Sequence, residues 1–390
     1  MLSIGRAYCA LYLATVLIQF AATLLISHLA LRLNAGGAST FWVGALMAAN
    51  ALGMAAGGSI GRTLIERLGQ VRAYAAGTGI IVTAVLAHEV SSALPFWLVL
   101  RGVAGIALMA QLMALESWLN ERAGNKERGR VLAVYMIATY GGMMLGQLGL
   151  TAGDGLDRRA LAGVAMAFAL CLVPVVMTRI PQPIVLARAR VGYGLLLRSV
   201  PQALMTVLVS GMINGAFFGL AAIYARQQGM GPDETGRFLA MPVAAALLVQ
   251  APLGMLSDRL PRAMLIRAIA ALLALVCSAL AMSSGLSSSA LMAFAFCVGA
   301  LQFCLYPLGA ALANELVDPA QRVALAGVLL TTFGIGSCIG PLAAGAAMGH
   351  AGPAALYWFF AACAALLVAA IGSARAGGAA APVKTPLPDC

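Results

Sequence analysis

Long apolar runs separated by short polar or charged clusters extend along the whole chain. A helix needs about 20 apolar residues to cross a hydrocarbon core of about 30 Å, and each run meets that length. The runs lack the alternating pattern of a membrane β-strand, so they predict helices rather than a closed barrel. The pattern predicts twelve membrane-spanning helices, at 8–32, 41–63, 72–91, 94–117, 131–153, 160–178, 202–225, 236–256, 263–283, 289–313, 323–348 and 354–374.

The composition favours the same class of protein. Of the 390 residues, 62% are apolar and 9% are charged, whereas globular chains average about 45–50% and about 25%. The mean hydropathy is +0.94. So few charges cannot hydrate the surface of a soluble protein of this size, which argues against a soluble enzyme. The first apolar run, from Tyr8 to Leu33, is too long for a signal-peptide core and is expected to remain as a span.

The basic residues predict how the helices are oriented. The net charge is +11, from 24 Lys and Arg against 13 Asp and Glu. If the N-terminus is cytoplasmic, 18 basic residues fall in cytoplasmic segments, five fall outside, and Arg101 lies within a helix. Basic residues concentrate on the cytoplasmic side of membrane proteins. We therefore expect a multi-pass protein of the bacterial inner (plasma) membrane with both termini in the cytoplasm, and the charge requires no nucleic acid partner.

The chain is expected to contain two copies of one six-helix unit. Glu66-Arg67 in one predicted loop matches Asp258-Arg259 in another at an offset of 192, and glycine motifs in the fifth and eleventh spans repeat at 194. Six-helix repeats in parallel are an architecture of secondary transporters. The predicted units are an N-terminal bundle at 1–178, a cytoplasmic linker at 179–200, a C-terminal bundle at 201–375 and a disordered tail at 376–390.

Two predicted loops and three predicted helices carry further motifs. Glycines let helices approach closely, and charged groups at helix ends can hold a loop against a neighbouring helix. The loop motifs comprise Gly61, Glu66, Arg67 and Arg72, then Gly254, Asp258, Arg259 and Arg262; the helix motifs comprise Arg101 with Gly105, Glu116, Gly142 with Gly146, and Gly336 with Gly340 and Pro341.

Together these motifs resemble the major facilitator superfamily over nearly the whole chain. Three short motifs of this chain resemble those of the YcaD-like bacterial branch of the family: Glu116-Ser117, Arg128-Gly129-Arg130 and Tyr140-Gly141-Gly142. The resemblance implies an all-α fold of twelve helices, and two loops that latch the halves together in one access state. The alternative is a loop that only anchors its helices. Gln70 stands where the family usually has a basic residue, although Arg72 could substitute for it.

Two helices also carry glycines at a spacing of four residues, which places them on one helical face. In the family the second span meets the eleventh, so such faces are expected to suit sliding between the halves; static packing is the alternative. The glycines are Gly53, Gly57 and Gly61 on the second span, and Gly211, Gly215 and Gly219 on the seventh.

Arg101 is the one basic residue deep within a predicted span. It lies roughly 7–8 Å to the outer side of the centre of its helix. Burying an arginine in a membrane is costly unless it faces water or a partner. We predict an anion-binding or coupling site in the central cavity; the alternative is an arginine satisfied by backbone carbonyls. No carboxylate lies deep in a span, and Glu89 with His88 is expected to be a solvated helix end.

Uncharged polar residues on the predicted spans outline a modestly polar pocket with aromatic walls. Each of them could instead form a hydrogen bond between helices. The further candidates for contact with a substrate are Gln19, Asn50, Tyr140, Asn214, Gln250, Gln302 and Tyr306.

The motifs leave transport as the expected function. The two lysines, Lys126 and Lys384, belong to no phosphate-binding loop. We predict no enzymatic activity, no cofactor and no metal, and a monomer whose partners are the bilayer and a small anionic or amphipathic solute. The expected mechanism is secondary active or facilitative transport by alternating access, with efflux favoured slightly over uptake. The alternative is a non-transporting sensor or lipid-handling protein on the same fold.

Overall fold

The computed structural model describes residues 2–122, 128–152, 158–177, 199–283, 285–318 and 321–373, and these are helical with short connections. Most of the predicted linker and the whole predicted tail lie outside the described residues. Each predicted span overlaps at least one helix. The first half comprises α1 Leu2–Ala35, α2 Thr40–Leu68, α3 Gln70–Ala87, α4 Leu94–Arg122, α5 Arg128–Leu148, η1 Gly149–Ala152, α6 Arg158–Leu170 and α7 Leu172–Met177. The second half comprises α9 Pro201–Gln227, α10 Pro232–Ser257, α11 Arg262–Met282, α12 Ser288–Leu316, α13 Arg322–Ala351 and α14 Ala355–Ser373.

The sixth predicted span is broken into two helices, contrary to the sequence-based expectation of one helix over 160–178. The chain turns at Cys171, between α6 and α7. Pro174 follows within the first turn of α7. Pro174 has no N–H to donate to the carbonyl of Leu170, and its ring crowds that carbonyl, which favours a kink or a break in the helix at this point.

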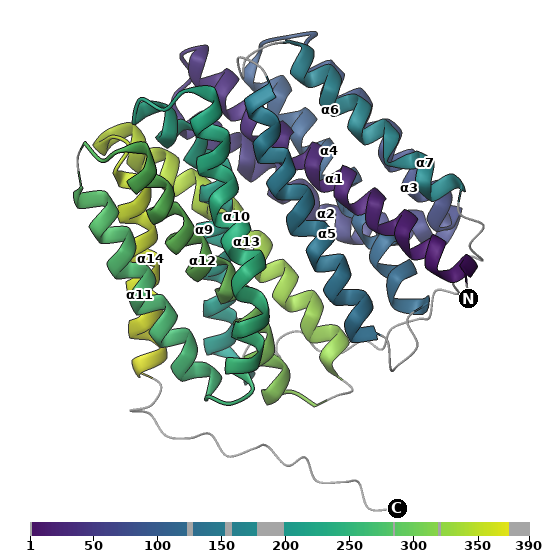
Figure 1. The fold of residues 1–390 in the computed structure, drawn as a ribbon. Coiled ribbons are helices and arrows are strands. Elements are labelled where there is room, and N and C mark those ends of the chain that lie inside the picture. The colour runs from purple at the N-terminus through teal and green to yellow at the C-terminus, as the bar shows by residue number, and fades with distance from the viewer. Residues whose placement is uncertain are drawn as a thin grey trace, which may run out of the picture.

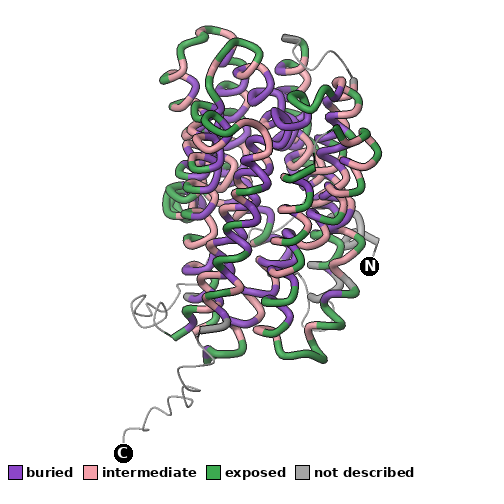
Figure 2. Tube along the Cα trace, turned by 90° about the vertical axis from the view of Figure 1, so that its left-hand side faces the viewer, coloured by how far each residue is buried: buried purple, intermediate pink, exposed green. Residues whose placement is uncertain are grey.

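The surface of the helices suits a lipid environment. Nine stretches of the described helices are long and apolar enough to cross a membrane, and α14 adds a shorter one at Ala355–Ile371. Large apolar side chains point outward from the peripheral helices: Leu275 on α11 is 68% exposed and Met166 on α6 is 61% exposed. Figure 2 shows exposed positions along the outside of the helices and buried ones inside. An apolar outer surface of this extent is typical of a multi-pass membrane protein.

The two halves lie side by side, with the first half on the right of Figure 1 and the second half on the left. Between the halves, α2 packs on α13, α5 on α10, and α1 on α9. The site therefore depends on which residues these helices present to one another.

Within each half, the glycine motifs join equivalent helices. A Cβ atom at Gly142 of α5 would lie 2.6 Å from the carbonyl oxygen of Val16 on α1, so only glycine allows this approach. Gly146 faces α1 in the same way. Gly336 and Gly340 of α13 meet the backbone of α9. The packing of α5 on α1 matches that of α13 on α9, because these helices hold the first and fifth predicted spans of each half. A duplicated unit would produce this correspondence.

The glycines at four-residue spacing do not provide a sliding face between the halves. Gly53, Gly57 and Gly61 of α2 pack against α4, in their own half. Gly211 and Gly215 of α9 pack against α13, also in their own half. Among these glycines, Gly219 approaches the other half, at Met47. The described contacts favour static packing for both rows, because the facing backbones leave no room for a side chain.

The halves meet closely at the end of the bundle where α2 begins and α13 ends. Gly44 lies against the backbone of Pro341, and the Thr40 hydroxyl donates a hydrogen bond of 2.6 Å to the carbonyl oxygen of Gly345. At the same end, a Cβ atom at Gly236 of α10 would lie 2.7 Å from the Thr151 methyl group. These contacts join α2 to α13 and α10 to η1.

Candidate functional site

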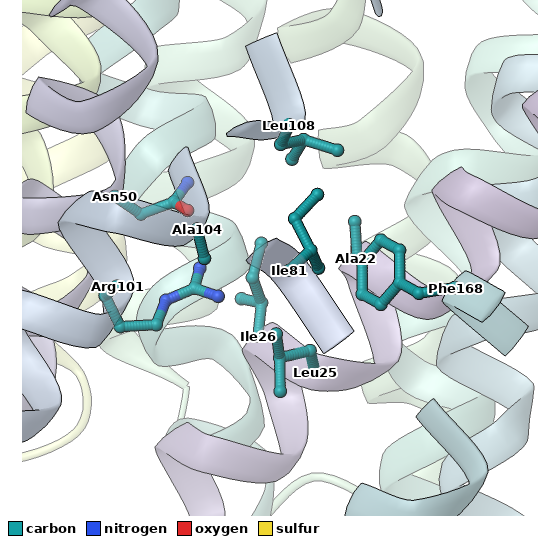
Figure 3. Close-up of a pocket in the computed structure, with 9 residues that line it drawn as sticks. All are labelled: Ala22, Leu25, Ile26, Asn50, Ile81, Arg101, Ala104, Leu108 and Phe168. Atoms are coloured by element: carbon teal, nitrogen blue, oxygen red, sulfur yellow. The ribbon is translucent and has the colours of Figure 1, made fainter. Parts of the chain in front are cut away.

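Arg101 points into a small pocket within the first half. The pocket is lined from α1, α2, α3, α4 and α6, and it has room for about one water-sized particle. Figure 3 shows the Arg101 guanidinium directed into this pocket, with the Asn50 amide beside it. The structure thus places Arg101 among the helices of one half, and not in the cavity between the halves that was predicted from the sequence.

The surroundings of Arg101 are apolar apart from Asn50. Arg101 is 2% exposed, and its Nε atom is buried without a hydrogen-bond partner among the described residues. The other lining residues are Ala22, Leu25, Ile26, Ile81, Ala104, Leu108 and Phe168. The motif glycine Gly105 packs α4 closely against the backbone of α2 at Asn50 and Met54, so Asn50 lies beside the helix that carries Arg101.

A charged and aromatic cluster that was not predicted from the sequence lies where α1 and α3 end and α4 begins. Arg32 forms a two-point ion pair with Glu89, in which Nη2 is 3.1 Å from Oε2. The Arg32 guanidinium carbon also lies 5.5 Å from the centre of the Trp97 ring. Trp97 packs edge to face on His88, with ring centres 5.2 Å apart.

This cluster corrects the expectation of a solvated helix end at His88 and Glu89. His88 is 1% exposed and Trp97 is 3% exposed. The side chains of Arg32 and Glu89 are 25% and 26% exposed. The sequence held two signals for this pair. Arg32 falls on the predicted outer side of the first span, where few basic residues are expected, and Glu89 falls at the predicted outer end of the third span.

Three of the predicted polar residues lie close together between the halves. The Gln250 side chain of α10 lies near the Tyr140 hydroxyl of α5, so the two polar groups face each other across the boundary between the halves. The Tyr140 ring packs edge to face on Phe303 of α12, with centres 5.9 Å apart. Tyr306 lies one turn beyond Phe303 and stacks edge to face on Phe333 at 5.1 Å. Phe303 and Phe333, which were not predicted from the sequence, complete this cluster.

The remaining polar candidates are dispersed. Asn50 belongs to the Arg101 pocket. Gln19 of α1 lies against Gly142 of α5, in the first half. Asn214 donates a hydrogen bond of 2.8 Å to the Ser210 carbonyl within α9. Gln302 is completely buried, and its amide has no hydrogen-bond partner among the described residues.

The loop after α10 is held within the second half. Arg262 forms an ion pair of 2.5 Å with Glu315 of α12, and a longer one of 3.6 Å with Asp258. Its Nε atom also donates to the Ser257 hydroxyl at 3.1 Å. The neighbouring latch candidates Gly254 and Arg259 are exposed.

The equivalent loop of the first half uses neutral groups. Gln70, at the position equivalent to Arg262, is buried and donates a hydrogen bond of 3.0 Å to the Ser117 hydroxyl of α4. The Tyr135 hydroxyl donates to Glu116 at 3.1 Å. Gly61 packs on Ala110 of α4. The latch candidates Glu66, Arg67 and Arg72 are exposed on the surface. The described contacts of both loops therefore lie within their own halves.

Comparison with known proteins agrees with this architecture. The model of the Major Facilitator Superfamily matches residues 203–385. The MFS-type transporter YcaD of Salmonella enteritidis PT4 is 31% identical over 280 residues, which cover 71% of this chain and 72% of the relative. The YcaD protein of Salmonella paratyphi A is 30% identical over 335 residues, covering 85% of each chain.

Solved transporters share the fold at low sequence identity. The nucleoside transporter NupG has a TM-score of 0.76 at 13% identity and covers 96% of this chain and 99% of its own. The D-xylose-proton symporter has a TM-score of 0.76 at 15% identity, covering 94% and 97%. With the relatives at 30% identity or more, these findings show that the chain belongs to the Major Facilitator Superfamily and is a YcaD-like transporter of that family.

Proposed function

We propose that this protein is a secondary active or facilitative transporter that carries a small solute across the bacterial inner membrane by alternating access. The observation that carries the proposal is the cluster of Tyr140, Gln250 and Phe303, which takes residues from both halves. A solute bound there contacts both halves, so a change in their relative angle can expose it to one side and then the other.

The close contacts between Thr40 and Gly345, and between Gly44 and Pro341, support one access state. With the N-terminus in the cytoplasm, as the basic residues predict, this end of the bundle faces away from the cytoplasm. The proposed state is therefore closed toward the outside, and a solute reaches the cluster from the cytoplasm.

The chemistry of the cluster favours an amphipathic solute. Its walls are the aromatic rings of Phe218, Phe303 and Phe333, and its polar groups are the uncharged side chains of Tyr140, Gln250 and Tyr306. Arg101 lies in a separate pocket, so the cluster itself offers no charge to an anion. We favour efflux over uptake, because an amphipathic solute enters a cell through the lipid without a carrier.

Flux measurements test the proposal. The purified protein is reconstituted in lipid vesicles and offered a panel of amphipathic and anionic solutes, with and without proton or sodium gradients; protein-free vesicles are the control. Saturable flux of one or more solutes is expected. Solutes that raise the Tm of the protein but are never transported would point to the sensor or lipid-handling alternative.

A further inference from the structure

We propose that the pocket around Arg101 is a binding site for a small monoanion taken from solution, separate from the solute cluster between the halves. The site would lie wholly within the first half, and the proposal does not depend on the proposed transport function. It rests on three features of the pocket: a buried cation with no acid among the described lining residues, a second donor, and otherwise apolar walls.

The first feature is the uncompensated charge of Arg101. A cation removed from water costs several kcal/mol unless an anion or a set of acceptors replaces the water. Arg101 is 2% exposed, and none of the residues that line its pocket is acidic. The nearest acid on its own helix, Glu116, is 15 residues further along, roughly 22 Å away. A bound anion would supply the missing charge.

The second feature is the Asn50 amide. It enters the same pocket from α2, and its Nδ2 atom contacts the Met54 sulfur at 3.7 Å. A thioether is a weak acceptor, so this amide group has donor capacity left for a ligand. With the guanidinium, which presents up to five N–H donors, the pocket offers donors from two helices to one acceptor.

The third feature sets the class of anion. The walls beyond Arg101 and Asn50 are apolar side chains, so the anion must lose most of its water to enter. One guanidinium balances one negative charge, which disfavours sulfate and phosphate dianions. The free space holds about one water-sized particle, which excludes a bulky carboxylate and favours the most compact monoanions. Chloride meets these conditions best; nitrate and formate need more room, although their planar oxygens match the guanidinium fork.

Thermal unfolding of the whole protein in detergent tests the site. Sodium gluconate is replaced stepwise by sodium chloride, nitrate or formate at constant ionic strength, and Tm is recorded. Because a ligand that binds the folded state raises its stability by mass action, a saturable increase in Tm is expected for the small anions. The Arg101→Gln variant should lose the increase, and Arg101→Lys should keep a weaker one.

Two further variants make the result specific. Arg237→Gln removes an arginine whose side chain is 58% exposed, and it should respond to the anions as the wild type does. Asn50→Leu should weaken the response, and it provides a second measurement if Arg101→Gln fails to fold. An identical Tm of the wild type in gluconate and in all three small anions would overturn the proposal. An undiminished saturable increase in Arg101→Gln would also overturn it.

Discussion

The hydroxyl of Thr40 on α2 donates a hydrogen bond of 2.6 Å to the carbonyl oxygen of Gly345 on α13, 305 residues away in the sequence. One turn further along α2, Gly44 lies against the backbone of Pro341. These contacts bring the two halves within backbone distance at one end. A transporter that alternates between two access states must break them in each cycle, so they are the place to test the mechanism.

Adding a side chain at Gly44 should force the halves apart at this end. In Gly44→Leu the new side chain meets the Pro341 carbonyl, and overpacking of this kind costs about 1–3 kcal/mol. The equilibrium should shift toward the other access state by roughly five-fold or more. The measurement uses a second substitution, Met47→Cys, at a residue that lies beside Gly219 across the interface. The rate at which this cysteine is alkylated is followed by mass spectrometry of its peptide.

Gly58 on the same helix is the matched control, because a Cβ atom there would have no neighbour within 4 Å. Gly58→Leu should leave the alkylation rate unchanged. Equal rates in the Gly44→Leu and Gly58→Leu proteins would contradict the proposed closure at this contact.

Removing the hydroxyl of Tyr140 should weaken the solute site without disturbing its aromatic wall. In Tyr140→Phe the ring can still pack on Phe303, but the hydroxyl group near Gln250 is lost. A hydrogen bond from this hydroxyl to a solute would contribute about 1 kcal/mol, so we expect roughly a five-fold loss of flux or of solute affinity. Tyr224→Phe is the control, since that ring packs on Tyr357 inside the second half. Equal losses in both variants would argue against a specific role of Tyr140.

The ion pair of Arg32 and Glu89 should stabilise the first half. Both side chains are about three-quarters buried, and the guanidinium also lies over Trp97. A double-mutant cycle with Arg32→Gln and Glu89→Gln, followed by Tm in detergent, should show a coupling of about 1 kcal/mol.

The pair of Arg237 and Asp233 provides the comparison for this cycle. It has a separation of 3.9 Å, and its side chains are 58% and 62% exposed. The same cycle there should give almost no coupling, because water screens both charges. Additive effects of the two changes at Arg32 and Glu89 would mean that the pair adds no stability of its own.

The two equivalent loops should respond differently to salt. Arg262 binds Glu315 through opposite charges, whereas Gln70 binds Ser117 through neutral groups. We expect Arg262→Ala to lower Tm more than Gln70→Ala at low salt, since hydrogen bonds to charged groups are stronger. The deficit of Arg262→Ala should shrink near 1 M salt, where the screening length falls to about 3 Å. If the loss of Tm in Arg262→Ala did not depend on salt, Arg262 and Glu315 would stabilise the protein through packing alone.

The sequence by itself determined that the chain is built of apolar helices and gave the approximate limits of most of them, because transfer into lipid depends on the apolar character of contiguous residues. Its motifs also determined the family, since Arg101 with Gly105 and the glycines of the fifth and eleventh spans are local patterns. The break at Cys171 was a local property too, but the apolar run across Pro174 concealed it.

The tertiary structure decided which residues meet. Arg32 and Glu89 are 57 residues apart, and the direction of Arg101 into one half depends on how α4 is rotated against α1 and α2. Likewise, Gly53, Gly57 and Gly61 form one face whether they pack on α4 or on α13. Spacing along a helix defines its faces, but the rotation and tilt at which helices pack select the partner of each face, and those arise from the whole bundle.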